Sequence, residues 1–313
     1  MTEANSRIRL MGTWIDLYVC HAEAKRLVAH AIQKLYDYNE RFSANDPSSQ
    51  LMQVNQRAGH APMAVDPDLF ELIKLGKAQS IASEGRLNIA IGPLVKLWGI
   101  GFEGAHRPDD SSIAACLEKI DPRQIKLEEA SQEVYLAQEG MEIDLGALAK
   151  GYFADRIMDD FIRAGAQSAM INLGGNVKVY GSPPKRPHQI NWRIGIQDPR
   201  KPRGQNCAVL QVHNQSVVTS GGYERHLEVD GHFYQHIFDS RTGYPVENEV
   251  ASVSVLTDQS VMAEVWTTRL YPMGLAEIQA ELAQARDYQA LVIDKQGRFL
   301  ASRGLLDRLQ VLK

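Results

Sequence analysis

The chain has 313 residues, of which 44% are hydrophobic and 23% are charged, an ordinary composition for a globular protein with a large core. Its net charge of −4 at pH 7 argues against a nucleic-acid-binding face as the main function. The three cysteines, Cys20, Cys116 and Cys207, lie far apart in the sequence. This spacing excludes a disulfide framework and a zinc knuckle, and it indicates a reducing compartment.

The first twenty residues carry charged side chains where a signal peptide has its apolar region: Glu3, Arg7, Arg9 and Asp16. No apolar run reaches the roughly 18–20 residues that are needed to span a bilayer. We therefore expect a cytoplasmic protein without a membrane anchor.

The pattern of apolar residues predicts helices and strands in an irregular order along the chain. Helices are expected at residues 22–38, 66–83, 153–165 and 261–273. Strands are expected at 9–20, 169–172, 177–181, 192–196, 208–212, 216–220, 224–229, 233–238 and 252–256, with hairpins within 122–142 and 291–302. Residues 43–49 are expected to form a loop, and residues 88–104 a buried or ligand-lining loop. Because no steady βαβ alternation occurs, the sequence predicts an α+β fold.

The run from Met141 to Asp155 brings an acid, a glycine and a lysine close together: Asp144, Gly146 and Lys150. It is typical of a turn that leads into a helix. Glycine lets a ligand approach the backbone, and the free N–H groups of a helix start favour anions. The segment indicates a phosphate or phosphate–metal site, or alternatively a glycine turn before a solvated helix. Neither GxGxxG nor GxxxxGK[ST] occurs, so this is not a Rossmann or P-loop site.

A histidine, an acid and an arginine lie within six positions at His236, Asp239 and Arg241. On a strand, His236 and Phe238 would share one face. A general base needs a group that titrates near neutral pH, which histidine provides. A structural histidine is the alternative interpretation.

Glu264 and Thr268 are four residues apart at an expected helix start and therefore neighbours on one face. A carboxylate beside a hydroxyl suits a hard cation such as Mg²⁺, although an acid at a helix start also complements the dipole. Two glycine pairs leave similar alternatives open. Gly174-Gly175 allows a ligand on bare backbone or a β-bulge. Gly221-Gly222, which follows the hydroxyl residues Thr219 and Ser220 within Val218 to Arg225, allows a phosphate contact or a turn.

Taken in order, these segments resemble the FAD:protein FMN transferase family (ApbE type) over about residues 9 to 275. The matching pieces are Met11-Gly-Thr13, Ile91-Gly-Pro-Leu94 with Leu97-Trp-Gly99, Asp144 to Gly151, Asn172 to Asn176, Trp192 with Ile194-Gly-Ile, Asp198-Pro199, Thr219-Ser-Gly221 with Tyr223-Glu-Arg225, His236 to Asp239 with Arg241-Thr-Gly243, and Ala263 to Thr268.

The resemblance implies one large domain over residues 1–313, T-fold-like, with mixed, mainly antiparallel sheets and packed helices. It implies a Mg²⁺-dependent transferase that moves the FMN half of FAD onto a Thr or Ser hydroxyl of an acceptor flavoprotein and releases AMP. The implied metal contacts are the Ala147 carbonyl, Glu264 and Thr268. The implied catalytic residues are His236, as the base, and Asp239. The implied FAD contacts are Met11, Asn45, Arg86, Leu87, Asn88, Asp144, Lys150 and Phe238.

Three residues depart from the family pattern. Glu264 stands where Asp is usual, Asn45 where many members have a flavin-stacking Tyr, and Asn88 where Asp is usual. Two other functions therefore remain as alternatives: a Mg²⁺-dependent FAD pyrophosphatase that gives FMN and AMP, and a non-catalytic FAD-binding protein.

Overall fold

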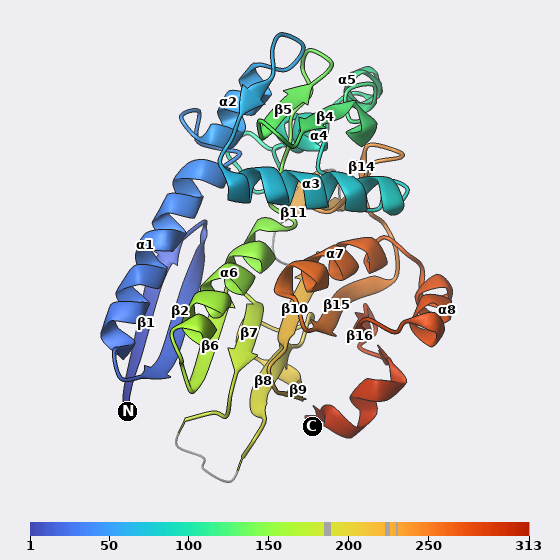
Figure 1. Cartoon of the computed structure of the whole chain (residues 1–313). Coiled ribbons are helices and arrows are strands. Elements are labelled where there is room, and N and C mark those ends of the chain that lie inside the picture. Colours follow the sequence, from blue (N-terminus) through green and yellow to red (C-terminus); the bar gives the residue numbers. More distant parts are fainter. Residues whose placement is uncertain (185–188, 223–225, 230, 313) are drawn as a thin grey trace. The chain divides into compact units, whose positions relative to one another are not determined.

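The computed structural model describes residues 1–184, 189–222, 226–229 and 231–312 (Figure 1). The chain divides into two compact units, each assembled from segments that are distant in the sequence. Unit 1 comprises Met1–Asn39, Lys150–Gly221 and Glu249–Lys313, and unit 2 comprises Glu40–Ala149 and Gly222–Asn248. The expectation of one domain over residues 1–313 stays a prediction.

Unit 1 is built on an eight-stranded sheet with the order β1-β2-β6-β7-β10-β15-β16-β17. Its strands are β1 (Thr2–Leu10), β2 (Thr13–His21), β6 (Ser168–Leu173), β7 (Asn176–Tyr180), β10 (Ser216–Gly221), β15 (Val250–Thr257), β16 (Gln289–Asp294) and β17 (Phe299–Ala301). Every neighbouring pair runs antiparallel. The predicted α+β class with mainly antiparallel sheets is confirmed.

Helices cover one face of this sheet. Figure 1 shows α1 (Ala24–Phe42), α6 (Ala149–Arg163) and α7 (Ser260–Leu270) lying over it, and α8 (Leu275–Gln284) follows α7 in the chain. The rings of Tyr38 on α1 and Phe153 on α6 stack with centroids 4.5 Å apart. Ser216 on β10 hydrogen-bonds Ser260 on α7, so even-numbered residues of this part of β10 face the helices.

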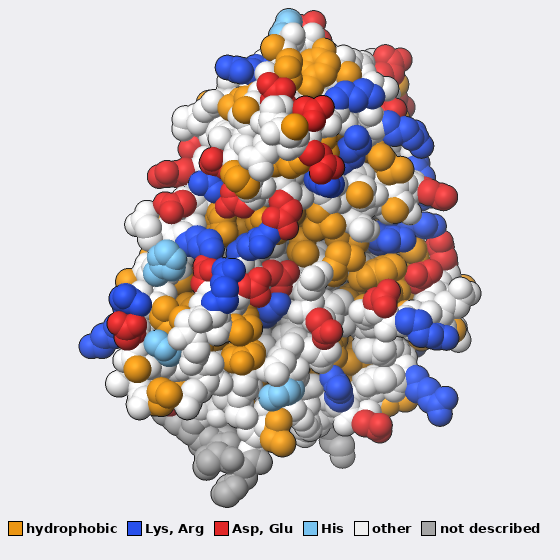
Figure 2. Space-filling model, in the orientation of Figure 1, with side chains coloured by type: hydrophobic (Ala, Val, Ile, Leu, Met, Phe, Trp, Pro, Cys, Tyr) orange, Lys and Arg blue, Asp and Glu red, His pale blue; other side chains and the backbone are white. Residues whose placement is uncertain are grey.

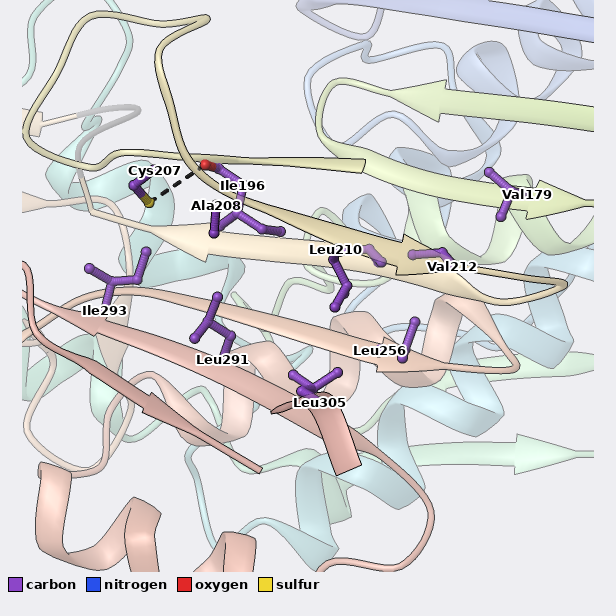
Figure 3. Close-up of a cluster of buried hydrophobic side chains, with 11 residues drawn as sticks. Val179, Ile196, Cys207, Ala208, Leu210, Val212, Leu256, Leu291, Ile293 and Leu305 are labelled. Atoms are coloured by element: carbon purple, nitrogen blue, oxygen red, sulfur yellow. Dashed lines mark hydrogen bonds between the residues drawn. The ribbon is translucent and has the colours of Figure 1, made fainter. Parts of the chain in front are cut away.

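The opposite face packs against a second sheet with the order β18-β9-β8, made of β8 (Trp192–Gln197), β9 (Asn206–Val212) and β18 (Leu309–Val311). A cluster of buried apolar side chains fills the space between the sheets (Figure 3). Leu210 of β9, Leu256 of β15 and Leu291 of β16 belong to it, with Leu305 from the 3₁₀ helix Arg303–Arg308. Strand alternation therefore directs one set of apolar residues into this core and leaves the other set for the helices.

Unit 2 combines small antiparallel sheets with short and medium-length helices. The sheets are β3 (Met63–Ala64), β5 (Glu133–Leu136) and β4 (Ile125–Glu128) in that order, then β11 (His226–Val229) with β12 (His232–Gln235), and β13 (Phe238–Asp239) with β14 (Tyr244–Pro245). The helices are α2 (Gln50–Gln56), α3 (Pro67–Ala82), α4 (Gly92–Trp98) and α5 (Asp110–Leu117), with a 3₁₀ turn at Pro122–Gln124. A Cβ at Gly76 of α3 would lie 2.7 Å from the Ile89 side chain, so glycine allows this helix to pack closely.

The strand expected over residues 9–20 is wrong in one respect, because a turn interrupts it. Met11 and Gly12 have φ values of 52° and 71°, and β1 pairs with β2 on either side of them. Successive residues with positive φ form the tight hairpin turn that suits the twist of antiparallel strands. The alternating residues before Met11 therefore form a strand of their own.

The loop expected over residues 88–104 is also partly wrong, because it contains α4. Pro93 stands in the first turn, where its missing N–H is not needed, and Gly99 ends the helix with a left-handed φ of 60°. Its glycines and proline favour a loop by their residue type, but here they mark the two ends of a short helix. Trp98 is fully buried.

Charged groups of both signs are interspersed on the face shown in Figure 2. This agrees with a small net charge of −4. Among the described residues, no helix combines the length and the apolar character that crossing a membrane requires.

Candidate functional site

The Asp144 turn in unit 2 leads directly into α6. Buried Asn55 holds the preceding residue: Ile143 N donates to Asn55 Oδ1 (2.8 Å), and Asn55 Nδ2 donates to Ile143 O (3.0 Å). The Gly146 N–H donates to Asp144 Oδ1 at 2.7 Å. A Cβ at Gly146 would lie only 2.9 Å from that oxygen. Glycine at this position therefore makes room for the acid, and binding of a phosphate by the turn stays a prediction.

Ala147 follows in the same turn and is exposed. Among the described residues, none donates a hydrogen bond to its carbonyl oxygen. A backbone carbonyl without a donor is a suitable ligand for a hard cation. Ala147 belongs to unit 2, whereas Glu264 and Thr268 belong to unit 1, and their joint role as metal ligands stays a prediction.

In unit 1, α6 and α7 touch at Gly151. A Cβ at Gly151 would lie 2.6 Å from Ser260 O and 2.8 Å from Glu264 Cγ, so only glycine permits this approach. The contact brings the Glu264 side chain beside the first turn of α6, where Lys150 stands. The positive charge of Lys150 acts on the Glu264 carboxylate and opposes its protonation.

Glu264 is a buried acid, with only 6% of its surface exposed. Burial raises the pKa of Glu264, while the charge of Lys150 and a hydrogen bond from Asn176 oppose the rise. Asn176 Nδ2 donates to Glu264 Oε1 at 2.8 Å. The second carboxylate oxygen has no hydrogen-bond donor within the part of the chain that the structure describes. A carboxylate so poorly compensated is expected to attract a cation.

Thr268 lies one helical turn after Glu264 and is partly buried. The neighbouring Thr267 hydroxyl instead donates to Glu264 O at 3.1 Å, within its own helix. A carboxylate and a hydroxyl on one helix face fit Mg²⁺, which usually keeps water and substrate phosphate in its other positions. No group of three or more His, Cys, Asp or Glu side chains able to hold a metal occurs among the described residues.

Met11 stands at the end of the sheet where a second glycine turn lies. Gly174 and Gly175 connect β6 to β7 with φ values of 67° and 103°. A Cβ at Gly174 would lie 2.3 Å from Thr13 Oγ1, so the two turns contact each other. The alternative of a β-bulge at Gly174-Gly175 is wrong, because Leu173 and Asn176 pair directly across a hairpin turn. Contact of Met11 with FAD stays a prediction.

The predicted FAD segment Arg86-Leu-Asn88 lies in unit 2, after α3. Leu87 is 1% exposed, so its side chain belongs to the core. Its backbone is engaged as well, because Leu87 N donates to Ser83 Oγ (3.0 Å) and Leu87 O accepts from the same hydroxyl (2.9 Å). The Asn88 side chain is engaged locally: it accepts from Ala90 N (2.9 Å) and donates to Ile120 O (2.8 Å). Asn88 therefore holds the loop together, and its predicted contact with FAD is not tested.

A polar pocket of about 370 Å³ lies next to this segment. Its walls include Gly85, Asn88, Arg123, Ser240 and Arg241. The Ser240 hydroxyl donates to Gly85 O at 2.6 Å, which joins the loop after α3 to the turn after β13. This contact brings together two distant segments of unit 2 that carry predicted site residues, Arg86 next to Gly85 and Asp239 next to Ser240.

The expectation that His236 and Phe238 share one face of a continuous strand is wrong. His236 and Ile237 form a break between β12 and β13, and His236 is partly buried. Before the break the chain pairs with β11, and after it with β14. Val246 N donates to Ile237 O at 2.8 Å, which fixes the change of partner. A base role for His236 stays a prediction.

Asp239 forms an ion pair with Arg241. Arg241 Nη2 lies 2.6 Å from Asp239 Oδ2, and the Arg241 N–H donates to Oδ1 at 2.9 Å. These bonds to Arg241 hold the pKa of Asp239 below its usual range, despite partial burial. The pair also closes the turn that ends at Gly243, whose N–H donates to Asp239 O at 2.8 Å. Asp239 therefore has a structural role in this turn, and its catalytic role stays a prediction.

Phe238 and Asn45 differ sharply in their surroundings. Phe238 is 7% exposed and packs on Trp98, with ring centroids 6.0 Å apart. Trp98 Nε1 in turn donates to Gly243 O at 3.0 Å. Asn45 lies exposed in the loop before α2, and its N–H donates to Ser43 Oγ at 3.2 Å. FAD contacts of both residues stay predictions.

Two of the matching sequence pieces add little to the description of the site. The Thr219 hydroxyl shares a 2.7 Å hydrogen bond with Ser254 on the neighbouring strand β15, inside the sheet. Tyr223, Glu224 and Arg225 lie outside the described residues, as do the first two residues of the strand expected over 224–229.

Sequence reasoning missed the polar residues that surround Glu264. Asn176 and Lys178 alternate with apolar residues along β7, a pattern that normally predicts a solvated face, yet both are buried. The Asp155 carboxylate on α6 forms an ion pair with Lys178 and accepts the N–H groups of Ser260 (2.8 Å) and Val261 (2.9 Å). The sequence named Asn176 within a matching piece and Asp155 at the end of the Met141 run, but it gave neither residue a role beside Glu264.

Known proteins resemble the chain over nearly its whole length. It is 41% identical over 287 residues to a FAD:protein FMN transferase of Klebsiella pneumoniae (strain 342), covering 91% of this chain and 87% of that protein. It is 38% identical over 281 residues to a FAD:protein FMN transferase of Treponema pallidum (strain Nichols), covering 87% of this chain and 78% of that protein.

Solved structures resemble the fold. The flavin transferase ApbE from Vibrio cholerae matches with a TM-score of 0.83 and 25% identity, over 98% of this chain and 99% of that one. The ApbE protein of Thermotoga maritima matches with a TM-score of 0.88 and 24% identity, over 97% and 98%. The sequence profile of the ApbE family matches residues 11–292, which include every predicted site residue. The chain belongs to the ApbE family.

Proposed function

We propose that this protein is a FAD:protein FMN transferase. The observation that carries the proposal is the buried Glu264 with Thr268 one turn along and Lys150 nearby, in a chain 41% identical to a protein of that name. FAD is the substrate, and the acceptor is a flavoprotein with an accessible Thr or Ser hydroxyl.

The reaction exchanges the phosphoanhydride bond of the FAD pyrophosphate for a phosphoester bond to the acceptor. The acceptor hydroxyl oxygen attacks the phosphorus on the FMN side of the FAD pyrophosphate. The bond from that phosphorus to the bridging oxygen breaks, and AMP leaves with the bridging oxygen and the electron pair. The hydroxyl proton goes to a base, for which we propose His236. The product is FMN joined to the acceptor through a phosphoester.

Glu264, Thr268 and the Ala147 carbonyl would hold the cation in this proposal. Bound Mg²⁺ would neutralise charge on the pyrophosphate. Lys150 adds positive charge on the protein side, close enough to Glu264 to affect its protonation. The remaining contribution of the protein is positioning, for which Asp144, Met11, Asn45, the 86–88 segment and Phe238 are the proposed FAD contacts.

Release of AMP and the fate of FMN test this proposal. The full chain is incubated with FAD and Mg²⁺, with and without an acceptor flavoprotein domain, and the products are separated by chromatography. We expect AMP together with protein-bound FMN when acceptor is present, and loss of both with EDTA. Free FMN in place of bound FMN would identify water as the acceptor and a pyrophosphatase. Intact FAD with a competent acceptor would contradict the proposal and indicate a binding protein.

We also propose a cytoplasmic location. All three cysteines are free: Cys20 and Cys116 are partly buried, and Cys207 is buried. Free thiols that lie far apart in the sequence suit a reducing compartment. Cell fractionation with an antibody to this chain checks the location, and recovery in an exported fraction would contradict it.

A further inference from the structure

Four buried polar side chains in unit 1 form a continuous chain of hydrogen bonds that ends on Glu264. Ser216 Oγ donates to Ser260 Oγ (2.8 Å), Ser260 Oγ donates to Asn176 Oδ1 (2.7 Å), and Asn176 Nδ2 donates to Glu264 Oε1 (2.8 Å). Ser216 and Ser260 are 0% exposed, Asn176 2% and Glu264 6%. Strand β10, helix α7 and strand β7 each supply part of this chain.

The bonds all run in one direction. A serine hydroxyl has one proton, so while Ser260 donates to Asn176 it can only accept from Ser216. Ser216 Oγ also lies 3.1 Å from Val177 O, so its proton is shared between that carbonyl and Ser260 Oγ. Because Asn176 Oδ1 receives the Ser260 proton, the amide must turn its NH₂ group toward Glu264. The last acceptor is therefore a carboxylate oxygen. Hydrogen bonds arranged in this way in a low-dielectric interior strengthen one another.

Contacts from α6 also fix the position of this hydrogen-bond chain at Ser260. Asp155 on α6 accepts the backbone N–H groups of Ser260 and Val261 at the start of α7. Lys178 forms an ion pair with Asp155, and its ammonium donates to Asp258 O at 3.0 Å. Gln259, the N-cap of α7, makes no side-chain capping bond, so the cap comes from α6. The position of Ser260, and through it of Asn176, is thus fixed from outside its own helix.

We propose that Asn176 is a positioning residue for the metal-binding carboxylate of Glu264, and that Ser260 and Ser216 set the orientation of its amide. The inference rests on the proposed function, since it assumes that Glu264 binds the cation. A glutamate has one more rotatable bond than the aspartate usual in the family, and a fixed donor removes part of that freedom. By holding Oε1, Asn176 leaves Oε2 for the metal.

Partners of this kind, which orient a metal ligand without touching the metal, commonly change metal affinity by about 10–100-fold when removed. In Asn176→Ala we therefore expect the Kd for the cation to rise by about 10–100-fold. Binding of FAD in EDTA should not change. The maximal rate should recover at saturating Mg²⁺, because the loss is in metal binding.

The experiment titrates Mn²⁺, as a stand-in for Mg²⁺, into the full chain and follows the free-ion signal by electron paramagnetic resonance. FAD binding is measured separately by flavin fluorescence. Ser260→Ala is the second variant, since it removes one oxygen and leaves Asn176 in place; a smaller rise in Kd is expected. Ser302→Ala is the matched control. Ser302 is a buried serine of unit 1 whose hydroxyl accepts from Ala290 N at 2.9 Å, and its loss should not change the Kd.

The outcomes separate the inference from the proposed function. If Glu264→Gln loses Mn²⁺ binding while Asn176→Ala and Ser260→Ala bind it as the unmodified chain does, the positioning role is overturned and the metal site stands. If Glu264→Gln binds Mn²⁺ normally, the metal site is wrong and the inference falls with it. If Asn176→Ala does not fold, Ser260→Ala decides in the same way.

Discussion

Glu264 is the residue on which the proposed chemistry depends most. A buried carboxylate with one hydrogen-bond donor and a lysine nearby is unfavourable in isolation, because burial disfavours its charged form. Selection of a neutral residue would remove that penalty. A cation bound beside Glu264 would offset the same penalty without loss of the acid.

Glu264→Gln should abolish Mg²⁺-dependent AMP release while the fold is kept. Gln retains the shape and an acceptor for Asn176 but removes the charge that the cation needs. Since a buried amide is less costly than a buried carboxylate, the metal-free variant should melt at the same temperature as the unmodified chain or higher. Thermal unfolding in EDTA and an AMP assay check both parts. Undiminished turnover would remove Glu264 from the metal site.

Asp239→Asn should change how stability depends on pH. Arg241 lowers the pKa of Asp239 in the folded state. The ion pair therefore stabilises the folded state at pH values above the usual aspartate pKa of about 3.9. This stabilisation is lost as the pH falls through the lowered pKa of the folded state. The Arg241 side chain is 54% exposed, which limits the effect to about 1 kcal/mol or less.

Urea unfolding at pH 7 and pH 3 measures this difference. The unmodified chain should be more stable than Asp239→Asn at pH 7, and the difference in their free energies of unfolding should be smaller at pH 3. An equal difference at both pH values would show that the loss comes from packing and not from the charge of Asp239.

At the residue scale, the sequence identified Glu264, Thr268 and Lys150 but not the side chains that hold them. Residue type and spacing suggested a cation site, whereas the orienting hydrogen bonds of Asn176 depend on the pairing of β7 with α7 across the fold. Local sequence carries no information on such contacts. The misassigned strand through His236 has the same origin, because a change of pairing partner leaves no local pattern.

At the element scale, the α6–α7 contact determines where Glu264 lies. Gly151 permits the approach of the two helices, and Asp155 caps α7 from one turn further along α6. The predicted helix at 261–273 is confirmed as Ser260–Leu270, and the one at 153–165 as Ala149–Arg163. Their long apolar periodicity made them predictable. The short helices α2 and α4 were missed, because seven residues give too little periodicity.

Gly151→Ala should push α6 and α7 apart. Its Cβ would lie 2.6 Å from Ser260 O and 2.7 Å from Val261 Cα, both backbone atoms that cannot turn aside. We expect a loss of about 1–3 kcal/mol in the free energy of unfolding, together with weaker metal binding. Gly274→Ala is the control, since its nearest neighbour would be 3.7 Å away. Equal stability of the two variants in urea would refute the close contact.

Asp155→Ala should destabilise unit 1 strongly. The change removes the cap of α7 and leaves the ammonium of Lys178 without its ion-pair partner. Lys178 as a residue is only 8% exposed. Loss of one partner of a buried pair typically costs about 3–5 kcal/mol. Replacing both residues, as in Asp155→Ala with Lys178→Met, should recover part of the loss. Urea unfolding measures it, and a loss under about 1 kcal/mol would mean that the pair is not buried as described.

At the scale of the whole molecule, the predicted site residues are divided between the two units. Met11, Lys150, Glu264 and Thr268 belong to unit 1, and the other predicted residues to unit 2. The α+β class was predictable because strands and helices do not alternate regularly. The division was not, since two of its four boundaries fall inside helices: Asn39 and Glu40 both lie in α1, and Ala149 and Lys150 both lie in α6. No linker composition marks either point.

The intact mass of an acceptor flavoprotein domain tests the central claim most directly. The domain is incubated with this protein and FAD, in Mg²⁺ or in EDTA, and with the Glu264→Gln variant in parallel. The account predicts a gain equal to one FMN less one water, seen only with Mg²⁺ and the unmodified chain, and absent when the target Thr or Ser is replaced by Ala. An unchanged mass while FAD is converted to AMP and free FMN would contradict it.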